Sequence, residues 1–453
     1  MDSPAKENKM GVMPMGRLIL SMSVPMILSM LVQALYNVVD SMFVARYSQD
    51  ALAALSYAFP AQNLMIGTAT GTGVGVNALL SKSLGEKNFD KANKTAANGI
   101  LLAMFGSVLF FLFGLFFAEP FITFQTKTPS IIAEGRTYLS IVTMLSFGIF
   151  GEIMFERLMQ STGKTIYTMF TQGIGAIINI ILDPIMIFGL LGCPQMGVAG
   201  AAYATVIGQI VAFVLGIVFN HKYNPEVRLY AKNFKPDFGI IGRIYAVGIP
   251  SIIMVGIGSV MTTAMNKILN GFSDVAASVF GVYFKLQSFA FMPVFGLNNG
   301  VIPVIAYNYG AQKRKRMLHA VRLGCIIATC FMGIGLLLMQ CIPAELFALF
   351  DAGEDMLAIG VPALRIISIS FVFAGVCIAL SSVFQSLGKG IYSMYISFAR
   401  QLVVLVPAAY LLSLSGNVNA VWWSFPIAEI ASITVSLLLF RHVYKTIIAK
   451  IPE

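Results

Sequence analysis

An aspartate, an asparagine and a proline stand together in the otherwise apolar stretch NIILDPIMIFG, residues 179–189. Asn179 lies four residues before Asp183, so a helix would place both side chains on one face. Pro184 has no N–H, which leaves the carbonyl of Ile180 without its usual helical partner. A carboxylate, an amide oxygen and a spare carbonyl suit a hard cation, and a proton could occupy the carboxylate instead. The stretch is therefore a candidate cation site.

The composition indicates that lipid surrounds most of this chain. Of 453 residues, 57% are hydrophobic and 11% are charged, whereas a soluble domain carries roughly 25% charged residues. Backbone groups in a bilayer must bond to each other, so apolar runs form helices of about 20 residues. The runs here are longer than the strands of an outer-membrane barrel. The sequence therefore predicts an all-α membrane protein.

Turns and charges divide the chain into about twelve apolar spans. We place them at 17–47, 51–82, 93–118, 131–162, 165–191, 196–220, 239–270, 275–308, 317–342, 356–387, 390–414 and 418–444. Basic residues concentrate in the loops after the second, sixth and eighth spans, as in the run Lys313–Arg316. By the positive-inside rule, we expect both termini in the cytoplasm.

The chain also repeats itself. A shift of 225 residues aligns residues 25–169 with the second half without a gap, most clearly QSTGKTIYTM (160–169) with QSLGKGIYSM (385–394). The repeat predicts two pseudo-symmetric six-helix lobes, the N-terminal lobe at 1–220 and the C-terminal lobe at 243–453, joined by a cytoplasmic linker at 221–242. Such transporters place the substrate site between the lobes and work by alternating access.

Several motifs in order resemble the multidrug and toxic compound extrusion (MATE) family, specifically its bacterial MepA-like branch. They are VDSMFVARYSQDALAAL (39–55), SLGEKNFDKAN (83–93), QSTGK (160–164), NIILDPIMIFG (179–189), GVAGAAYATVIGQ (197–209) and NYGAQKRKRM (308–317). The resemblance covers nearly the whole chain and implies twelve helices in two six-helix lobes. It also implies a cation-coupling site in the first lobe at Asp40, Asn179, Asp183 and a threonine of the sixth span, most simply Thr205.

The depth of Asp40 agrees with such a site. Asp40 lies seven residues and Asp183 eight residues before the outer end of its span, or roughly 10 Å below it. Alternatively, the two aspartates only bond neighbouring helices. The repeat places Met265 opposite Asp40 and the acid-free stretch 402–410 opposite Asp183, which confines coupling to the first lobe and argues against a second-lobe sodium site.

Other intramembrane residues are candidates for a substrate cavity. Flexible thioethers and aromatic rings suit a promiscuous apolar cavity, although most of the 25 Met and 35 Phe must pack against lipid or the core. Glu152 and Glu156 either line an inner vestibule or snorkel to the interface, and Arg400 and Glu429 are expected to form an ion pair. Lys285 either faces the cavity or pairs with a carbonyl. The candidate cavity residues are Tyr36, Asn37, Glu156, Met261, Met265 and Lys285.

We interpret the chain as a secondary-active multidrug efflux antiporter of the bacterial plasma membrane, with a role in antibiotic resistance. It would export amphipathic or cationic drugs and toxins in exchange for H⁺ or Na⁺, as a monomer among membrane lipids. No cofactor and no metal other than Na⁺ is expected, and the basic residues lie in loops rather than in a nucleic-acid-binding stripe.

Three alternatives stay open. A flippase or exporter of lipid-linked or polysaccharide substrates, from the same wider superfamily, often has extra spans, and none is visible here. An intramembrane enzyme would need a nucleophile–base pair or a metal cluster, and the three histidines lie at loops or helix ends. A channel fits a one-sided acidic site less well than alternating access does. The absence of a GxxxxGK[ST] loop disfavours direct ATP coupling.

Overall fold

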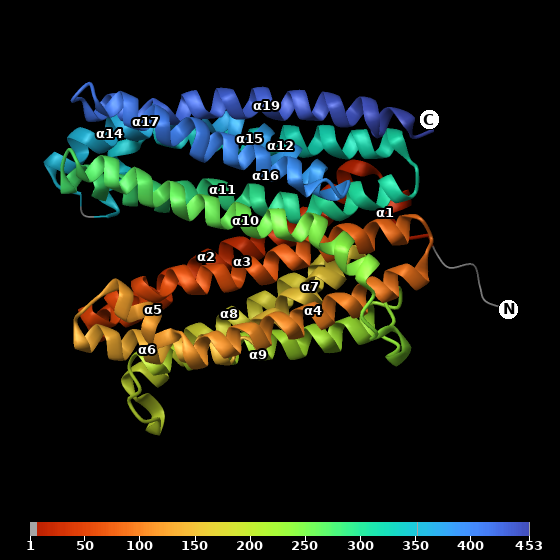
Figure 1. Ribbon diagram of the computed structural model, residues 1–453, viewed down its shortest axis with the longest axis horizontal. Helices are drawn as coiled ribbons and strands as arrows, with labels where there is room; N and C mark the ends of the chain where they lie inside the picture. The colour runs from red at the N-terminus through yellow and green to blue at the C-terminus, as the bar shows by residue number, and fades with distance from the viewer. Residues whose placement is uncertain (1–6, 351, 453) are drawn as a thin grey trace.

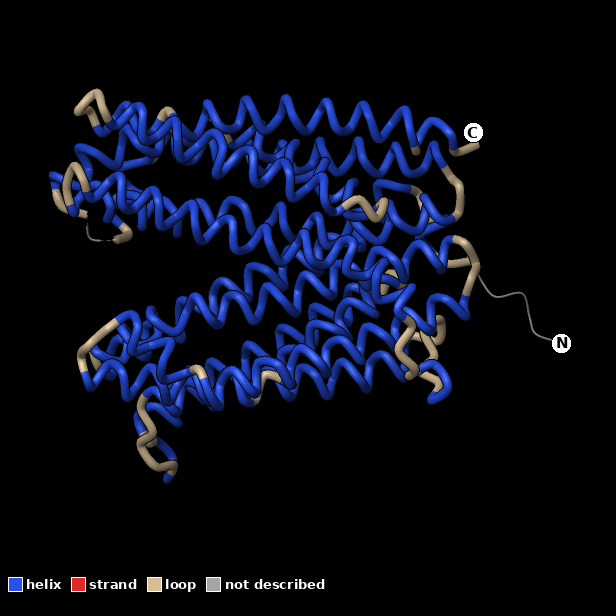
Figure 2. The backbone as a smooth tube through the Cα atoms, in the orientation of Figure 1, coloured by secondary structure: helices blue, strands red, loops and turns tan. Residues whose placement is uncertain are grey.

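The computed structural model describes residues 7–350 and 352–452, in which every regular element is a helix (Figure 2). Ten of these helices are long and apolar enough to cross a membrane. The number reaches 12 when each of two bent helix pairs is taken as one span. The expectation of an all-helical membrane protein with about twelve spans is therefore confirmed.

Helices α2 to α9 form one bundle and α10 to α19 the other, and α1 (Lys9–Val12) packs on α11 where the bundles meet (Figure 1). The first bundle contains α2 (Met15–Tyr47), α3 (Gln49–Gly85), α4 (Phe89–Phe116), α5 (Ala118–Gln125), α6 (Pro129–Met144), α7 (Phe147–Ser161), α8 (Thr165–Phe188), η1 (Leu190–Gly192) and α9 (Val198–Tyr223). We refer to these bundles as the first and second lobes. The connection between them contains η2 (Ala231–Asn233).

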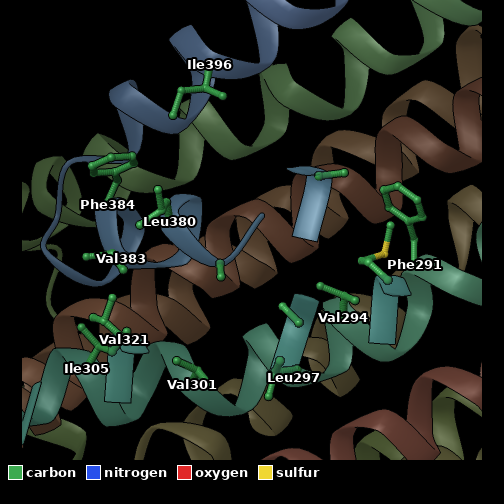
Figure 3. Close-up of a cluster of buried hydrophobic side chains, with 14 of the residues drawn as sticks. Phe291, Val294, Leu297, Val301, Ile305, Val321, Leu380, Val383, Phe384 and Ile396 are labelled. Atoms are coloured by element: carbon green, nitrogen blue, oxygen red, sulfur yellow. The ribbon is translucent and has the colours of Figure 1, made fainter. Parts of the chain in front are cut away.

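The second lobe continues with helices of matching lengths. It contains α10 (Phe238–Asn270), α11 (Asp274–Gly310), α12 (Arg314–Cys341), α13 (Pro343–Ala348), α14 (Glu354–Ser368), α15 (Phe371–Ser386), α16 (Gly390–Phe398), η3 (Ala399–Leu405), α17 (Val406–Ser413), α18 (Val418–Trp422), α19 (Ser424–Thr446) and η4 (Ile448–Lys450). Of these, η3 is a π-helix. The core of the second lobe shows helical spacing. Val294, Leu297, Val301 and Ile305 of α11 face side chains of α12 and α15 (Figure 3).

The fourth span of each lobe is broken rather than straight. Helices α6 and α7 meet at 45°, and α14 and α15 meet at 49°. The breaks lie at residues 145–146 and 369–370, close to equivalent positions of the repeat, and neither contains proline or glycine. Ser146 donates a hydrogen bond to the carbonyl of Ser107 in α4, and Ser370 donates one to the carbonyl of Ile367. The uninterrupted spans predicted at 131–162 and 356–387 therefore need this correction.

The lobes touch through small residues at the end of the molecule that carries both termini, which we call the closed end. Here α2 packs on α11 and α3 on α10, and the helices diverge toward the opposite, open end (Figure 1). Any Cβ on Gly85 would collide with the carbonyl oxygen of Tyr307, and any Cβ on Gly310 would collide with that of Lys82. The two contacts are related by the repeat, so glycine is required by close backbone approach.

Helix α1 bridges the lobes at the closed end. The side-chain amide of Asn8 donates to the Glu226 carboxylate at 2.7 Å, next to the first lobe. On the other side, Arg316 of α12 donates to the carbonyl of Met13 at 2.7 Å, and Asn308 of α11 donates to that of Met10 at 3.0 Å. Burial raises the pKa of Glu226, and the hydrogen bond from Asn8 partly opposes this. The segment before α2 therefore ties both lobes together.

Candidate functional site

A cavity of about 700 Å³ lies between the two lobes. Helices α2, α3, α7, α8 and α9 line it from the first lobe, and α10, α11, α15, α16, η3 and α19 line it from the second. Most of the described residues that line it are apolar or carry uncharged polar groups. Four of them are charged: Glu152, Glu156, Arg157 and Arg400. The cavity is therefore large enough for a drug-sized molecule and places that molecule where both lobes can touch it.

Three helices of the first lobe bring the four candidate cation ligands together. Asn179 of α8 donates to the hydroxyl of Thr205 in α9 at 3.2 Å, and approaches Asp183 Oδ1 at 3.5 Å. The carboxyl group of Asp40, on α2, lies next to that of Asp183. All four side chains are buried, Asp183 completely. Asn179 and Thr205 also line the cavity, so the cluster adjoins the substrate space.

The cluster has spare acceptor oxygens. Among the described residues, Asp40 Oδ1, Asn179 Oδ1 and Asp183 Oδ2 are buried and have no hydrogen-bond donor. Each such oxygen costs about 1–3 kcal/mol if it stays unsatisfied. Two carboxylates in contact also repel each other unless a proton or cation neutralises the pair. The arrangement can therefore bind a proton or a small cation, which would neutralise the carboxylates and satisfy these oxygens.

Pro184 does not break the helix around this cluster. Helix α8 runs without interruption from Thr165 to Phe188, so the missing N–H of Pro184 removes one hydrogen bond without a kink large enough to end the helix.

The candidate cavity residues separate into two groups. Tyr36, Glu156 and Met261 line the cavity. Asn37 and Lys285 are exposed on other faces of α2 and α11, and Lys285 Nζ lies 5.7 Å from the ring centre of Phe350. Met265 is completely buried in the core of the second lobe. These last three residues are outside the cavity lining, because neighbouring positions on a helix point in different directions.

The two glutamates of α7 both face the cavity. Glu156 is buried, and its carboxylate accepts hydrogen bonds from Thr171 Oγ1 at 3.1 Å and from Gln172 Nε2 at 2.8 Å. Glu152, one turn away, is only partly buried and also lines the cavity. Both carboxylates therefore lie where they can interact with a positively charged group in the cavity.

Sequence reasoning missed Arg157, which connects the lobes. Its guanidinium donates from Nη1 to Gln160 Oε1 and to Asn299 Oδ1, both at 2.9 Å, and Asn299 belongs to α11 of the second lobe. Gly73 of α3 leaves room for the arginine, since a Cβ there would press on Arg157 Cγ. The stretch EIMFERLMQ (152–160) could have identified Arg157, because it places an arginine next to Glu156 within an apolar span.

Among its described residues, the second lobe has no equivalent of the acidic cluster at the positions that the repeat places opposite Asp40 and Asp183. Met265, opposite Asp40 in the repeat, is apolar, and so are most residues of the stretch 402–410. The helix opposite α8 is interrupted by the π-helix η3, which changes the number of residues per turn and explains why the repeat loses its register there. The predicted ion pair between Arg400 and Glu429 is confirmed, with Nη1 and Oε2 3.3 Å apart.

Within residues 7–350 and 352–452, no group of three or more His, Cys, Asp or Glu side chains could hold a metal ion. The oxygen cluster around Asp183 instead mixes two carboxyl groups with neutral amide and hydroxyl oxygens.

Solved structures of MATE transporters share this fold. A solved outward-facing structure of a multidrug resistance MATE family transporter of the MOP superfamily matches with a TM-score of 0.92 at 22% identity, covering 98% of this chain and 99% of that one. The MATE multidrug transporter DinF-BH, solved in complex with a small-molecule ligand, matches with a TM-score of 0.89 at 28% identity and the same coverage. The fold and its central cavity define a two-lobed membrane transporter.

Sequence comparison gives the family. The MatE family model matches residues 25–185 and 250–411, which is more than half of the chain. The chain is 24% identical over 434 residues to the multidrug export protein MepA of Staphylococcus aureus (strain MSSA476), covering 94% of this chain and 93% of that protein. It is 26% identical over 431 residues to the probable multidrug resistance protein YoeA of Bacillus subtilis (strain 168), covering 93% and 92%.

The chain therefore belongs to the MatE family. It is a multi-pass membrane protein and a MATE-family multidrug export transporter rather than an enzyme, and transporters of this family are ion-coupled. The resemblance read from the sequence motifs is confirmed.

Proposed function

We propose that this protein is a secondary-active antiporter of the bacterial plasma membrane that exports amphipathic or cationic organic compounds in exchange for H⁺ or Na⁺. The coupling ion would bind at Asp40, Asn179, Asp183 and Thr205. The observation that supports this most is the set of unpartnered, buried oxygens of Asp40, Asn179 and Asp183 directly beside the cavity. With both termini in the cytoplasm, the open end would face outward.

The coupling follows from differential binding. An ion can drive transport only if it binds one conformation of the lobes more tightly than the other. The cluster joins α2, α8 and α9, and α2 also packs against α11 of the second lobe. Ion binding would therefore change the position of α2 relative to α8 and bias the contact between the lobes. This is the alternating-access scheme expected for two-lobed transporters.

The chemistry of the cluster makes H⁺ the first ion to test. The carboxyl groups of Asp40 and Asp183 lie side by side and repel each other when both are ionised, and one bound proton removes this repulsion. Sodium remains the other candidate, because the hydroxyl of Thr205 and the amide oxygen of Asn179 add neutral oxygen ligands.

Purified protein in liposomes tests the proposal. Efflux of ethidium would be followed while a proton gradient and a sodium gradient are imposed in separate experiments at zero membrane potential. We expect one of the two gradients to drive ethidium against its concentration, and its collapse by an ionophore to stop transport. Transport that proceeds equally without either gradient would contradict ion coupling.

A further inference from the structure

The charges that line the cavity are divided between the lobes. The first-lobe wall carries two carboxylates, Glu152 and Glu156, and one guanidinium, Arg157. Arg157 is hydrogen-bonded to Gln160 and Asn299 and is the next residue after Glu156. The described lining from the second lobe carries a single charged group, the guanidinium of Arg400. The cavity therefore presents acidic groups on one wall and a cation on the other.

Arg400 is only loosely held. It lies in the π-helix η3, a type of distortion that is frequent at functional sites. Its contact with Glu429 of α19 is one hydrogen bond, from Nη1 to Oε2 at 3.3 Å, rather than the bidentate pair that arginine forms with a well-placed carboxylate. The Arg400 side chain is 28% exposed, whereas that of Glu429 is 6% exposed. Several N–H donors of the guanidinium are thus free to point into the cavity.

Three buried polar groups, from Glu429, Ser432 and Ser436, lie on one face of α19. Oε1 of Glu429 has no donor within the described part of the chain, and the hydroxyls of Ser432 and Ser436 on the same helix have no partner there either. All three groups are buried, and Ser432, three residues after Glu429, lies beside it on the same face of α19. If Glu429 loses Arg400, the hydroxyl of Ser432 is therefore available to donate a hydrogen bond to its carboxylate.

We propose that Arg400 is a specificity-determining residue that binds the carboxylate of zwitterionic, amphipathic substrates. Their cationic end lies toward Glu152 and Glu156, and Glu429 competes with the substrate for Arg400. When a substrate carboxylate takes the exposed donors of Arg400, Glu429 turns to the hydroxyl of Ser432. The second lobe thus selects for a negative group while the first lobe selects for a positive one. This inference rests on the proposed export function.

A pair of dyes tests the proposal. Tetramethylrhodamine and its ethyl ester share one cationic ring system and differ in a free carboxylate. Binding of each dye to the purified protein would be measured by fluorescence anisotropy, and the readout is the ratio of the two dissociation constants, acid over ester. Binding is measured apart from transport, so a failure of the export function and a failure of this inference give different results.

Three variants separate the roles of the pair. The double variant Arg400→Gln, Glu429→Gln keeps the site neutral, so no buried charge is left unpaired, and the ratio should rise about tenfold because the acid loses a charge-assisted hydrogen bond. Glu429→Gln alone removes the competitor and should lower the ratio several-fold. Arg400→Lys keeps the cation without its fork and should give a ratio between those of the wild type and the double variant.

Lys285→Gln is the matched control, since it removes a cation from the same lobe outside the cavity, and it should leave the ratio unchanged. An unchanged ratio in the double variant, with the ester still bound, would overturn the role of Arg400. Wild-type protein that binds both dyes with these ratios but exports neither under any gradient would overturn the export function while the binding role of Arg400 stands.

Discussion

Arg157 in the first lobe donates a hydrogen bond of 2.9 Å to the side-chain oxygen of Asn299 in the second lobe. Both residues line the central cavity, so this bond joins the two lobes inside the substrate space. Alternating access requires the lobes to change their contact at this level. We therefore expect this bond to stabilise the present conformation relative to the alternative one.

Asn299→Ala should shift this balance. Arg157 keeps Gln160 as a partner, so we expect a loss of about 1 kcal/mol, or roughly a fivefold change in the ratio of conformations. Distances between spin labels placed on the two lobes at the closed end would measure it. Asn298→Ala is the matched control, because Asn298 bonds the carbonyl of Ile378 within the second lobe. Equal effects of the two variants would contradict the role of the Arg157 bond.

The glycines of the closed end give a second prediction. Gly85→Ala and Gly310→Ala should each force the lobes apart, because the added methyl would collide with a carbonyl oxygen of the other lobe. We expect a lower unfolding temperature and greater reactivity of cysteines introduced at the closed end.

Gly256→Ala and Gly333→Ala are the controls, since a Cβ at either position meets open space. Alanine in these helices should be neutral or stabilise by about 0.5–1 kcal/mol. Destabilisation of all four variants to the same extent would show that close approach between the lobes is not the cause.

The orientation of the chain is a third prediction. A cysteine at Gln312, in the exposed turn between α11 and α12, should react with a membrane-impermeant thiol reagent only from the cytoplasmic side. A cysteine at Leu191, which is 90% exposed between α8 and α9, should react only from outside. Labelling of the Gln312 variant by this reagent in intact cells would contradict the predicted orientation.

Much of the fold could be predicted because lipid restricts the chain so strongly. Apolar runs must be helices in a bilayer, and the repeat defines two lobes from glycines such as Gly85 and Gly310. Asp40 and Asp183 were found because a carboxylate in an apolar span is costly and therefore rare. The broken spans were missed because serine, rather than proline or glycine, stands at each bend.

The directions of individual side chains could not be predicted as well. Lipid and the protein core are both apolar, so hydrophobicity does not distinguish the inner from the outer face of a membrane helix. This is why Asn37, Lys285 and Met265 were expected in the cavity but lie elsewhere. Arg157 was overlooked because its partner Asn299 comes from the other lobe, 142 residues away in sequence.

The coupling site is tested most directly by Asp40→Asn and Asp183→Asn in liposomes. Each asparagine keeps the volume of the aspartate and one acceptor oxygen, replaces the other oxygen by an NH2 donor, and removes the ionisable group, so it should insert into the membrane at least as well. Dye binding should persist while the response of efflux to the imposed H⁺ or Na⁺ gradient falls at least tenfold, since the ion no longer favours one conformation. Gradient-driven efflux at the wild-type rate in the double variant would contradict ion coupling at this cluster.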